Sequence, residues 1–429
     1  MSDVVPASAY NHRMVDAELD ELLGSLSAVS LEGPKGVGKT STAVRRGGTL
    51  IKLDDPATYE VVLAQPSRLT TGVAPIVIDE WQRYPPSWDV VRRAVDDDNS
   101  PGRFMLTGSA TPTGKPTHSG AGRIVPLRMR PLTLVERGVE TPTVSLAALL
   151  TGNKDPLAGT TAVTAEDYAT EILAGGFPGM RHSSGRAQRA AIDGYLERMV
   201  DTDLPELGVE VRNPATLQRW VRAYAAATST TTSYDKIRDA ATSGEDTKPA
   251  KSTTIPYRDA LERIWILEPV PAWTGSANHL RRLTSAPKHQ LADPALAARL
   301  VGVDAQALLR GEGPGLVRRD GTFLGALFES LATLDVRVFA QTSEATVAHF
   351  RTRGGEREVD LVVVRGDQRV VAIEVKLAQV IVDADVKHLT WLRSQLGEDL
   401  LDAIVLSTGP EAYRRPDGIG VVPLALLGP

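Results

Sequence analysis

The chain has 429 residues, of which 42% are hydrophobic and 24% are charged, so two or three domains with real cores are expected and disorder along its whole length is excluded. Its 48 Lys and Arg residues against 53 Asp and Glu residues give a net charge of −5, which excludes a uniformly basic nucleic-acid coat but not a local basic patch. Cysteine is absent, which excludes disulfides, thiolate zinc sites, iron–sulfur clusters and cysteine nucleophiles.

Neither a membrane span nor a secretion signal is expected. No stretch approaches 18 consecutive apolar residues. The first residues also lack a basic start followed by an apolar block. We therefore expect a cytoplasmic protein without a membrane partner.

The N-terminal quarter of the sequence alternates short apolar runs with helical stretches. The patterns predict helices over 14–26 and 40–46, and strands over 28–31, 50–53, 76–78 and 104–106. Short apolar strands that alternate with helices favour a parallel sheet with crossover helices, so the fold class expected here is α/β.

A glycine-rich loop lies between the first strand and the following helix. Residues 33–40 fit the pattern G-x-x-x-x-G-K-[ST] in the context that a phosphate-binding P-loop requires, which disfavours a chance match by a glycine-rich turn. Backbone N–H groups of such a loop surround phosphate oxygens. Lys39 should bridge the β- and γ-phosphates, and the Thr40 hydroxyl should bind Mg²⁺. The residues expected to bind ATP here are Gly33, Pro34, Lys35, Gly36, Val37, Gly38, Lys39, Thr40 and Ser41.

The strand over 76–78 ends in two acids, 40 residues after Lys39. Asp79 is expected to hold Mg²⁺, directly or through water, and Glu80 to orient and deprotonate the attacking water. A solvated strand end is the alternative, which the P-loop upstream disfavours. The second acid favours hydrolysis over a P-loop kinase, and no correctly spaced Asn-Lys-x-Asp motif indicates a GTPase.

Two further sets of polar residues follow the next strand. Thr107 and Ser109 could hydrogen-bond the γ-phosphate or the lytic water, although a turn-forming Thr-Gly-Ser explains them nearly as well. Arg123 follows residues 111–122, which are rich in Gly, Ser, Thr and Pro and are expected to form a mobile loop. In a homo-oligomer Arg123 could act as a catalytic arginine on the γ-phosphate of a neighbouring subunit, and a surface arginine is the alternative.

The middle of the chain is expected to be largely helical. Residues 141–163 are interpreted as a linker, and the helical stretch that follows is broken by the Gly-Gly-Phe-Pro sequence at 175–178. Helices over 234–241 and 252–266 could form a winged-helix shape that contacts DNA phosphates, although their apolar residues would equally suit a packing helix. The basic residues available for such contacts are Lys236, Arg238, Lys248, Lys251, Arg258 and Arg263.

The last third predicts a helix over 322–334 and strands over 336–340, 347–351, 359–364, 370–375 and 403–406. If a hairpin turn is centred on Asp367, residue i pairs with residue 734 − i. Asp360 then lies opposite Glu374, and Lys376 shares the face of Glu374 because side chains alternate along a strand. Two carboxylates and a lysine therefore converge, although a solvated strand face is the alternative.

The sequence resembles AAA-superfamily ATPases of bacteria and archaea that carry a fused C-terminal half of unknown function. The matching text is GPKGVGKTS, IVIDEWQRYPPSW, FMLTGSA, GRIVPLRMRPLTLVE, ILAGGFPG and EVDLVVVRGDQRVVAIEVK. The resemblance implies a P-loop ATPase domain over 1–160, a helical lid with a winged-helix-like segment over 161–285, and an α/β restriction-endonuclease-like domain of the PD-(D/E)XK type over 286–429. It also implies that Arg13 lies near the base of the bound nucleotide.

The resemblance to restriction-enzyme-like nucleases assigns roles in the last domain. Asp360 and Glu374 would hold Mg²⁺, which activates water and stabilises the phosphate transition state. Lys376 would orient the water or stabilise developing charge, and Glu329 matches the additional helical acid of that fold. Fold alone does not establish cleavage, so binding of nucleic acid without cutting is an open alternative.

The function favoured by the sequence is a Mg²⁺-dependent ATPase whose ATP binding and hydrolysis are coupled to a nucleic-acid-binding or nuclease-like C-terminal domain. The expected cofactors are ATP and Mg²⁺, and DNA or another nucleic acid is the expected partner. The alternative is a regulatory ATP switch whose C-terminal half binds a protein partner and has no nuclease activity.

Overall fold

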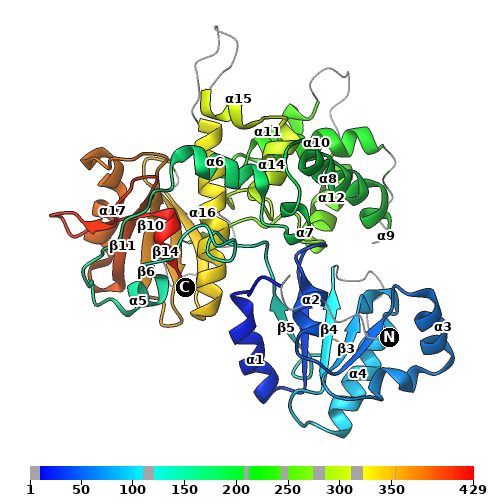
Figure 1. Ribbon diagram of the computed structural model, residues 1–429. Helices are drawn as coiled ribbons and strands as arrows, with labels where there is room; N and C mark the ends of the chain where they lie inside the picture. Colours follow the sequence, from blue (N-terminus) through cyan, green and yellow to red (C-terminus); the bar gives the residue numbers. More distant parts are fainter. Residues whose placement is uncertain are drawn as a thin grey trace.

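The computed structural model describes residues 10–109, 120–206, 211, 213–242, 250–273, 286–310, 322–352 and 354–429. Most of the loop expected over 111–122 lies outside these residues, as does Lys248. In Figure 1 the N-terminal α/β core, in blue, lies below the helices of the middle part, and a long helix separates these helices from the C-terminal sheet. None of the described helices combines the length and the apolarity that a membrane crossing requires.

The N-terminal core is a five-stranded sheet in which all neighbouring strands run parallel, which confirms the predicted sheet with crossover helices. The strand order is β2-β3-β4-β1-β5. The strands are β1 (Ala28–Glu32), β2 (Thr49–Lys52), β3 (Ile76–Asp79), β4 (Phe104–Gly108) and β5 (Val125–Arg128), and the helices are α1 (Val15–Ser25), α2 (Lys39–Val44), α3 (Pro56–Ala64) and α4 (Pro86–Asp97).

Alternate residues of the central strands pack into two separate cores. Val77 and Met105 pack with the apolar residues of α1 and α2. Their neighbours Ile78 and Leu106 pack with those of α3 and α4 on the opposite face. Helices therefore cover both faces of the sheet, and only the strand ends can present polar residues to a ligand.

The middle part is helical. Its elements are α6 (Ala165–Ala174), α7 (Pro178–Arg181), α8 (Gly185–Arg198), the π-helix η4 (Met199–Asp203), α9 (Leu204–Glu206), α10 (Pro214–Ala226), α11 (Tyr234–Ala240), α12 (Lys251–Arg263), α14 (Pro294–Val301) and α15 (Ala305–Arg310). The predicted helix pair is confirmed at α11 and α12. Isolated antiparallel bridges join Leu267 to Leu291 and Val270 to Lys288.

The C-terminal part is a mixed seven-stranded sheet of order β12-β13-β11-β10-β9-β8-β7. Its strands are β7 (Ala272–Trp273), β8 (Thr346–Arg351), β9 (Glu358–Val364), β10 (Val370–Val375), β11 (Leu400–Ser407), β12 (Tyr413–Arg414) and β13 (Gly420–Pro423). Apolar residues of α16 (Thr322–Thr342) pack against one face of this sheet, and those of α17 (Asp383–Leu396) pack against the other.

The hairpin register predicted for β9 and β10 is confirmed. Val370 pairs with Val364 and Ile373 pairs with Leu361, so each pair of residue numbers sums to 734. Continuing the ladder by one residue places Asp360 opposite Glu374. The register follows from the turn, in which the amide of Arg365 donates a hydrogen bond to the carbonyl of Arg369.

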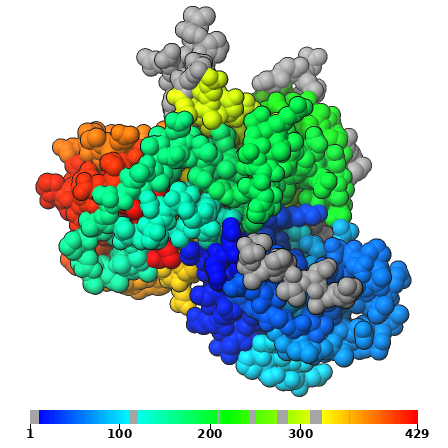
Figure 2. All heavy atoms as spheres, in the orientation of Figure 1, coloured from blue at the N-terminus to red at the C-terminus, as the bar shows by residue number. Residues whose placement is uncertain are grey.

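Two predictions for secondary structure are wrong. The strand expected over 336–340 belongs to α16, because Val336, Phe339 and Ala340 are buried at helical spacing. The expected linker over 141–163 is partly folded onto the C-terminal sheet: β6 (Val144–Ser145) pairs with β14 (Leu427–Gly428), and α5 (Leu146–Thr151) buries three leucines against β10 and β11. Figure 2 shows teal residues beside the red C-terminal end of the chain.

Candidate functional site

The glycine-rich loop lies at the carboxyl edge of the N-terminal sheet, between β1 and α2. Gly36 and Gly38 have φ values of +83° and +99°, which residues with a side chain rarely adopt. A Cβ atom on Gly33 would lie 2.1 Å from the carbonyl oxygen of Met129. The loop therefore needs glycine for close approach at its start and for left-handed backbone later.

Lys39 bends back over its own loop. Its Nζ donates hydrogen bonds to the carbonyl oxygens of Gly33 at 2.8 Å and Pro34 at 2.9 Å. Burial lowers the pKa of Lys39 to about 8, an effect that the nearby carboxylate of Glu80 opposes. A phosphate group entering the loop would supply the anion that this desolvated ammonium needs.

Three strand- and helix-end residues form a compact oxygen cluster beside Lys39. The Thr40 hydroxyl donates to Asp79 Oδ1 at 2.7 Å, and the Thr107 hydroxyl donates to the same oxygen. Asp79 pairs with Thr107 across β3 and β4, which explains why both side chains meet at one edge. Hydroxyl and carboxylate oxygens are hard ligands that suit Mg²⁺, so Thr40 and Asp79 fit the expected ion.

Glu80 follows Asp79 with φ of +54°, a strained value for a non-glycine residue and one often found at functional sites. Gln82 Nε2 donates to Glu80 Oε2, and the Ser109 hydroxyl lies 3.3 Å from the same oxygen. Burial raises the pKa of Glu80, whereas Lys39 opposes the rise. Gln82 was not among the predicted site residues, although it stands in the quoted Asp-Glu-Trp-Gln sequence.

The helical middle part contacts the phosphate loop directly. Phe177, in the predicted Gly-Gly-Phe-Pro break, lies 3.8 Å from where a Cβ atom of Gly36 would be. Lys35 Nζ lies 3.3 Å from Asp203 Oδ1 at the end of η4. Figure 1 shows α7 and α9 above the blue core. The middle part is therefore in direct contact with the loop that is expected to bind phosphates.

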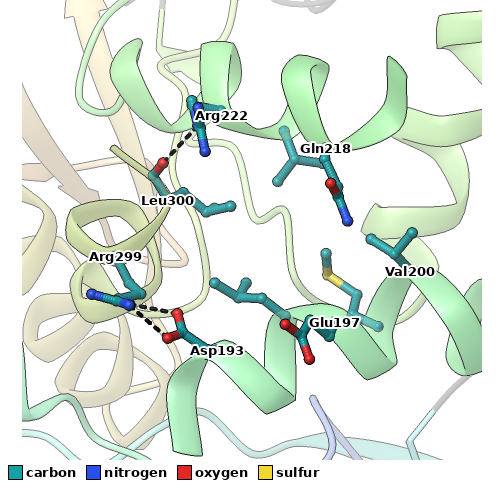
Figure 3. A pocket seen from close by; sticks show the side chains of 10 residues that line it. Asp193, Glu197, Val200, Gln218, Arg222, Arg299 and Leu300 are labelled. Atoms are coloured by element: carbon teal, nitrogen blue, oxygen red, sulfur yellow. Dashed lines mark hydrogen bonds and ion pairs between the residues drawn. The ribbon is translucent and has the colours of Figure 1, made fainter. Parts of the chain in front are cut away.

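A pocket of about 190 Å³ opens between α8, α10 and α14 (Figure 3). Asp193 and Arg299 form a two-pronged ion pair at 2.5 Å on one wall. The start of η4 forms another wall, and Asp203 at its end contacts Lys35. One short π-helix, an element frequent at functional sites, therefore joins this pocket to the phosphate loop.

Arg123 is not brought to the phosphate loop of its own chain. It lies just before Val125, which pairs with Val29 near the beginning of β1, whereas the loop follows the end of β1. Its guanidinium contacts Asp96 at 2.9 Å, at the end of α4. Arg123 therefore lies at the opposite edge of the sheet, so its action on a neighbouring subunit stays a prediction and a surface arginine stays the alternative.

Arg13 is buried against the backbone of the phosphate loop. Its Nη1 donates to the carbonyl oxygen of Val37 at 2.6 Å, and its Nε donates to Glu136 Oε1 at 2.9 Å. The structure thus places Arg13 next to the loop, as a support for its backbone. The predicted proximity to the base stays a prediction.

Two arginines near the end of β5 form a cluster that sequence reasoning missed. Arg128 stacks on Trp265 at 3.8 Å and lies 3.5 Å from Glu268. Arg130 lies 2.8 Å from Glu268, and Arg337 of α16 lies 3.8 Å from it. One buried carboxylate therefore joins the N-terminal core to the middle part and to α16.

The predicted acidic residues of the C-terminal part do converge. Asp360 Oδ2 accepts a hydrogen bond from the amide of Val375 at 2.9 Å, and Lys376 Nζ lies 2.6 Å from Glu374 Oε1. Burial raises the pKa of Glu374 to about 8, and Asp360 adds to this rise. Glu329 approaches the same cluster from α16.

The cation inside this cluster is Lys288, which the sequence analysis missed. Its Nζ lies 2.8 Å from Glu329 Oε1, 3.0 Å from Asp360 Oδ1 and 3.4 Å from Glu358 Oε1. Among the described residues, no group of three or more His, Asp or Glu side chains is arranged to hold a metal ion. The residues present therefore do not fit the expected Mg²⁺, because an ammonium group stands among its ligands.

Three of the basic residues predicted to contact DNA pair with acidic residues of the same two helices. Arg238 and Lys251 both contact Asp235, at 2.8 and 3.2 Å, and Arg258 contacts Asp259 at 2.9 Å. Four acidic residues share α11 and α12, namely Asp235, Asp239, Asp259 and Glu262. The surface of this helix pair is therefore mixed in charge, and contact with phosphates stays a prediction.

Three stretches of the chain match known protein families. Residues 26–137 match the family described as an AAA domain. Residues 165–307 and 324–427 match two families described as domains of unknown function, DUF8612 and DUF4143. The match over residues 26–137 supports an AAA-type P-loop domain in the N-terminal part.

Relatives and solved structures give more distant matches. Uncharacterized proteins of Mycobacterium bovis and Mycobacterium tuberculosis are each 29% identical over 325 residues, spanning 74% of this chain and 65% of their own length. A Walker-type ATPase of Pyrococcus abyssi aligns with a TM-score of 0.40 and 17% identity over 70% of this chain and 99% of its own. The RuvB Holliday junction branch migration motor of Thermotoga maritima aligns with a TM-score of 0.25 and 19% identity over 60% and 89%.

Proposed function

We propose that the chain is a Mg²⁺-dependent ATPase whose nucleotide state is transmitted through the helical middle part to the C-terminal half. The observation that carries this proposal is the oxygen cluster of Thr40 with the buried Asp79 and Thr107 beside Lys39, followed by Glu80 at the next position. The residues proposed as phosphate ligand, metal ligand and base lie together at one edge of the N-terminal sheet.

Each residue of this cluster would have a separate role in ATP hydrolysis. The loop amides and Lys39 would hold the β- and γ-phosphates once Lys39 leaves the carbonyls of its own loop. Glu80, held by Gln82 and Ser109, would accept a proton from the attacking water. Thr40 and Asp79 would hold Mg²⁺, which supplies charge stabilisation on the phosphate oxygens.

Binding of ATP is the first test of this function. Calorimetry with MgATP should show one binding event in the intact protein, and Lys39→Ala should weaken it at least about tenfold, because a buried phosphate contact is lost. Lys387→Ala is the matched control, since Lys387 is exposed on α17. No binding to well-folded protein would contradict the proposal.

The helical part should modulate nucleotide affinity through Asp203. Its carboxylate contacts Lys35 of the loop and would oppose the negative charge of the phosphates. Asp203→Asn should therefore tighten MgATP binding roughly two- to fivefold at low salt, and high salt should erase the difference because the pair is exposed.

Glu206→Gln is the control for Asp203→Asn, because Glu206 pairs with Arg83 and does not contact the loop. Calorimetry on both variants separates the two contacts. Weaker binding by Asp203→Asn would show that Asp203 orders the loop and does not compete with phosphate.

The partner of the C-terminal half is the finer part of the proposal. The order of elements and the Asp360–Glu374 register support coupling to a nucleic-acid-binding or nuclease-like domain. The mixed charge of α11 and α12, together with Lys288 in the acidic cluster, favours the second candidate, a regulatory ATP switch that binds a protein partner. ATP turnover with and without single- and double-stranded DNA discriminates the two, since only a nucleic-acid-coupled enzyme should respond.

A further inference from the structure

We propose that Lys288 is a built-in cation that takes the place of a divalent metal in the C-terminal acidic cluster, so that this half of the chain keeps a nuclease-like architecture without metal-dependent cleavage. The inference concerns cleavage alone, and both binding of nucleic acid without cutting and binding of a protein partner are compatible with it. It does not depend on ATP binding, because the cluster shares no residue with the phosphate loop.

The position of the ammonium group carries the proposal. Lys288 Nζ contacts one carboxylate from α16, that of Glu329, and two from β9, those of Glu358 and Asp360. The contacts with Glu329 at 2.8 Å and Asp360 at 3.0 Å are charge-assisted hydrogen bonds, and the contact with Glu358 at 3.4 Å is a longer ion pair. A Mg²⁺ ion would need the same oxygens at about 2.0–2.1 Å around its own centre. The ammonium and the metal therefore exclude each other.

The backbone of Lys288 is fixed, so its side chain is not free to withdraw with a loop. Its amide and its carbonyl both pair with Val270, at 2.9 and 2.8 Å, and the next residue, His289, donates its amide to Thr230 at 2.8 Å. The Lys288 residue is 0% exposed. The ammonium group of Lys288 is therefore held in the cluster by a segment whose backbone is hydrogen-bonded to the helical part both at Lys288 and at His289.

The charge of the cluster explains why a cation is needed there. Asp360 is buried and the Glu329 side chain is only 14% exposed, and a carboxylate removed from water in this way requires a cation or a proton nearby. Lys376 contacts Glu374 at 2.6 Å and Arg351 contacts Glu358 at 3.5 Å, which leaves Glu329 and Asp360 to Lys288. One fixed lysine thus supplies the compensation that a metal supplies in a nuclease site.

Manganese binding by the full chain without nucleotide tests the exclusion. The Asp79→Asn background removes the metal ligand of the phosphate loop, so that signals report the C-terminal cluster. In this background the protein should bind no Mn²⁺ by electron paramagnetic resonance, whereas adding Lys288→Met should create one site. A further Asp360→Asn change should abolish that site.

Two results would overturn the proposal. One is Mn²⁺ binding by the Asp79→Asn protein that disappears in Asp360→Asn, and the other is a folded Lys288→Met protein that gains no site. If Lys288→Met does not fold, DNA cleavage by the unaltered protein tests the proposal instead. Incubated with Mn²⁺ and single- or double-stranded DNA, the unaltered protein should cut DNA no faster than the double variant Asp360→Asn, Glu374→Gln. Faster cutting would show that the cluster is a working metal site.

Discussion

Glu80→Gln should leave MgATP binding intact and lower the rate of ATP hydrolysis by about 10²–10³-fold. The amide has the size of the carboxyl group and can keep contact with Ser109, whose hydroxyl lies 3.3 Å from Glu80 Oε2. It cannot accept a proton from water, so the chemical step alone is affected. Calorimetry and single-turnover hydrolysis, measured on the same protein, would show tight binding with bound ATP left uncleaved.

The control for this prediction is Glu60→Gln, because Glu60 is exposed on α3 and lies away from the loop. It should leave binding and hydrolysis unchanged. Undiminished hydrolysis by Glu80→Gln would remove Glu80 from its role as base. Loss of ATP binding would instead show that the charge of Glu80 supports the fold of the site, for instance through Lys39.

The arrangement of the candidate nucleotide site was predictable because its residues follow from local sequence and one topological rule. The P-loop pattern locates the phosphates, and the carboxyl ends of parallel strands meet at one edge. Asp79 and Thr107 both end such strands, and the structure joins them in one register pair. The same reasoning could not place Arg123, because its position relative to the edge depends on how residues 111–122 connect the two strands.

The C-terminal hairpin was predictable for a similar reason. A short turn fixes the register of both strands, so the juxtaposition of Asp360 and Glu374 follows from the position of Asp367. Lys288 carries no such signal, since it is a single lysine in an irregular stretch, far from these acids in sequence. Long-range contacts of this kind depend on tertiary packing and leave no local pattern.

The two wrong interpretations share a physical cause. Val336 to Ala340 is rich in β-branched and aromatic residues, but burial on all sides lets a helix accept such a run. Residues 144–151 lack clear periodicity because they form only a two-residue strand and a short helix. Their stability comes from the C-terminal sheet, which the sequence of the segment does not reveal.

Glu268→Gln should lower the free energy of unfolding by about 3–5 kcal/mol, because three guanidinium groups would lose the carboxylate contact that they share. Burial alone would raise the pKa of Glu268, yet Arg130, Arg128 and Arg337 hold it well below its usual value. The stabilisation is therefore complete above about pH 4.3, the usual pKa of glutamate, and is lost only as the pH falls further.

Denaturant unfolding of Glu268→Gln at pH 7 measures this loss, and Asp20→Asn provides the control. Asp20 pairs with Arg46 at 2.7 Å but is 63% exposed, so its replacement should cost less than about 1 kcal/mol. Glu268 lies in the segment that follows α12 and contacts arginines both at the end of β5 and on α16. Its replacement should therefore also separate the unfolding of the N-terminal core from that of the remaining chain. Equal, small effects of both substitutions would show that the three parts are joined by apolar packing and not by this carboxylate.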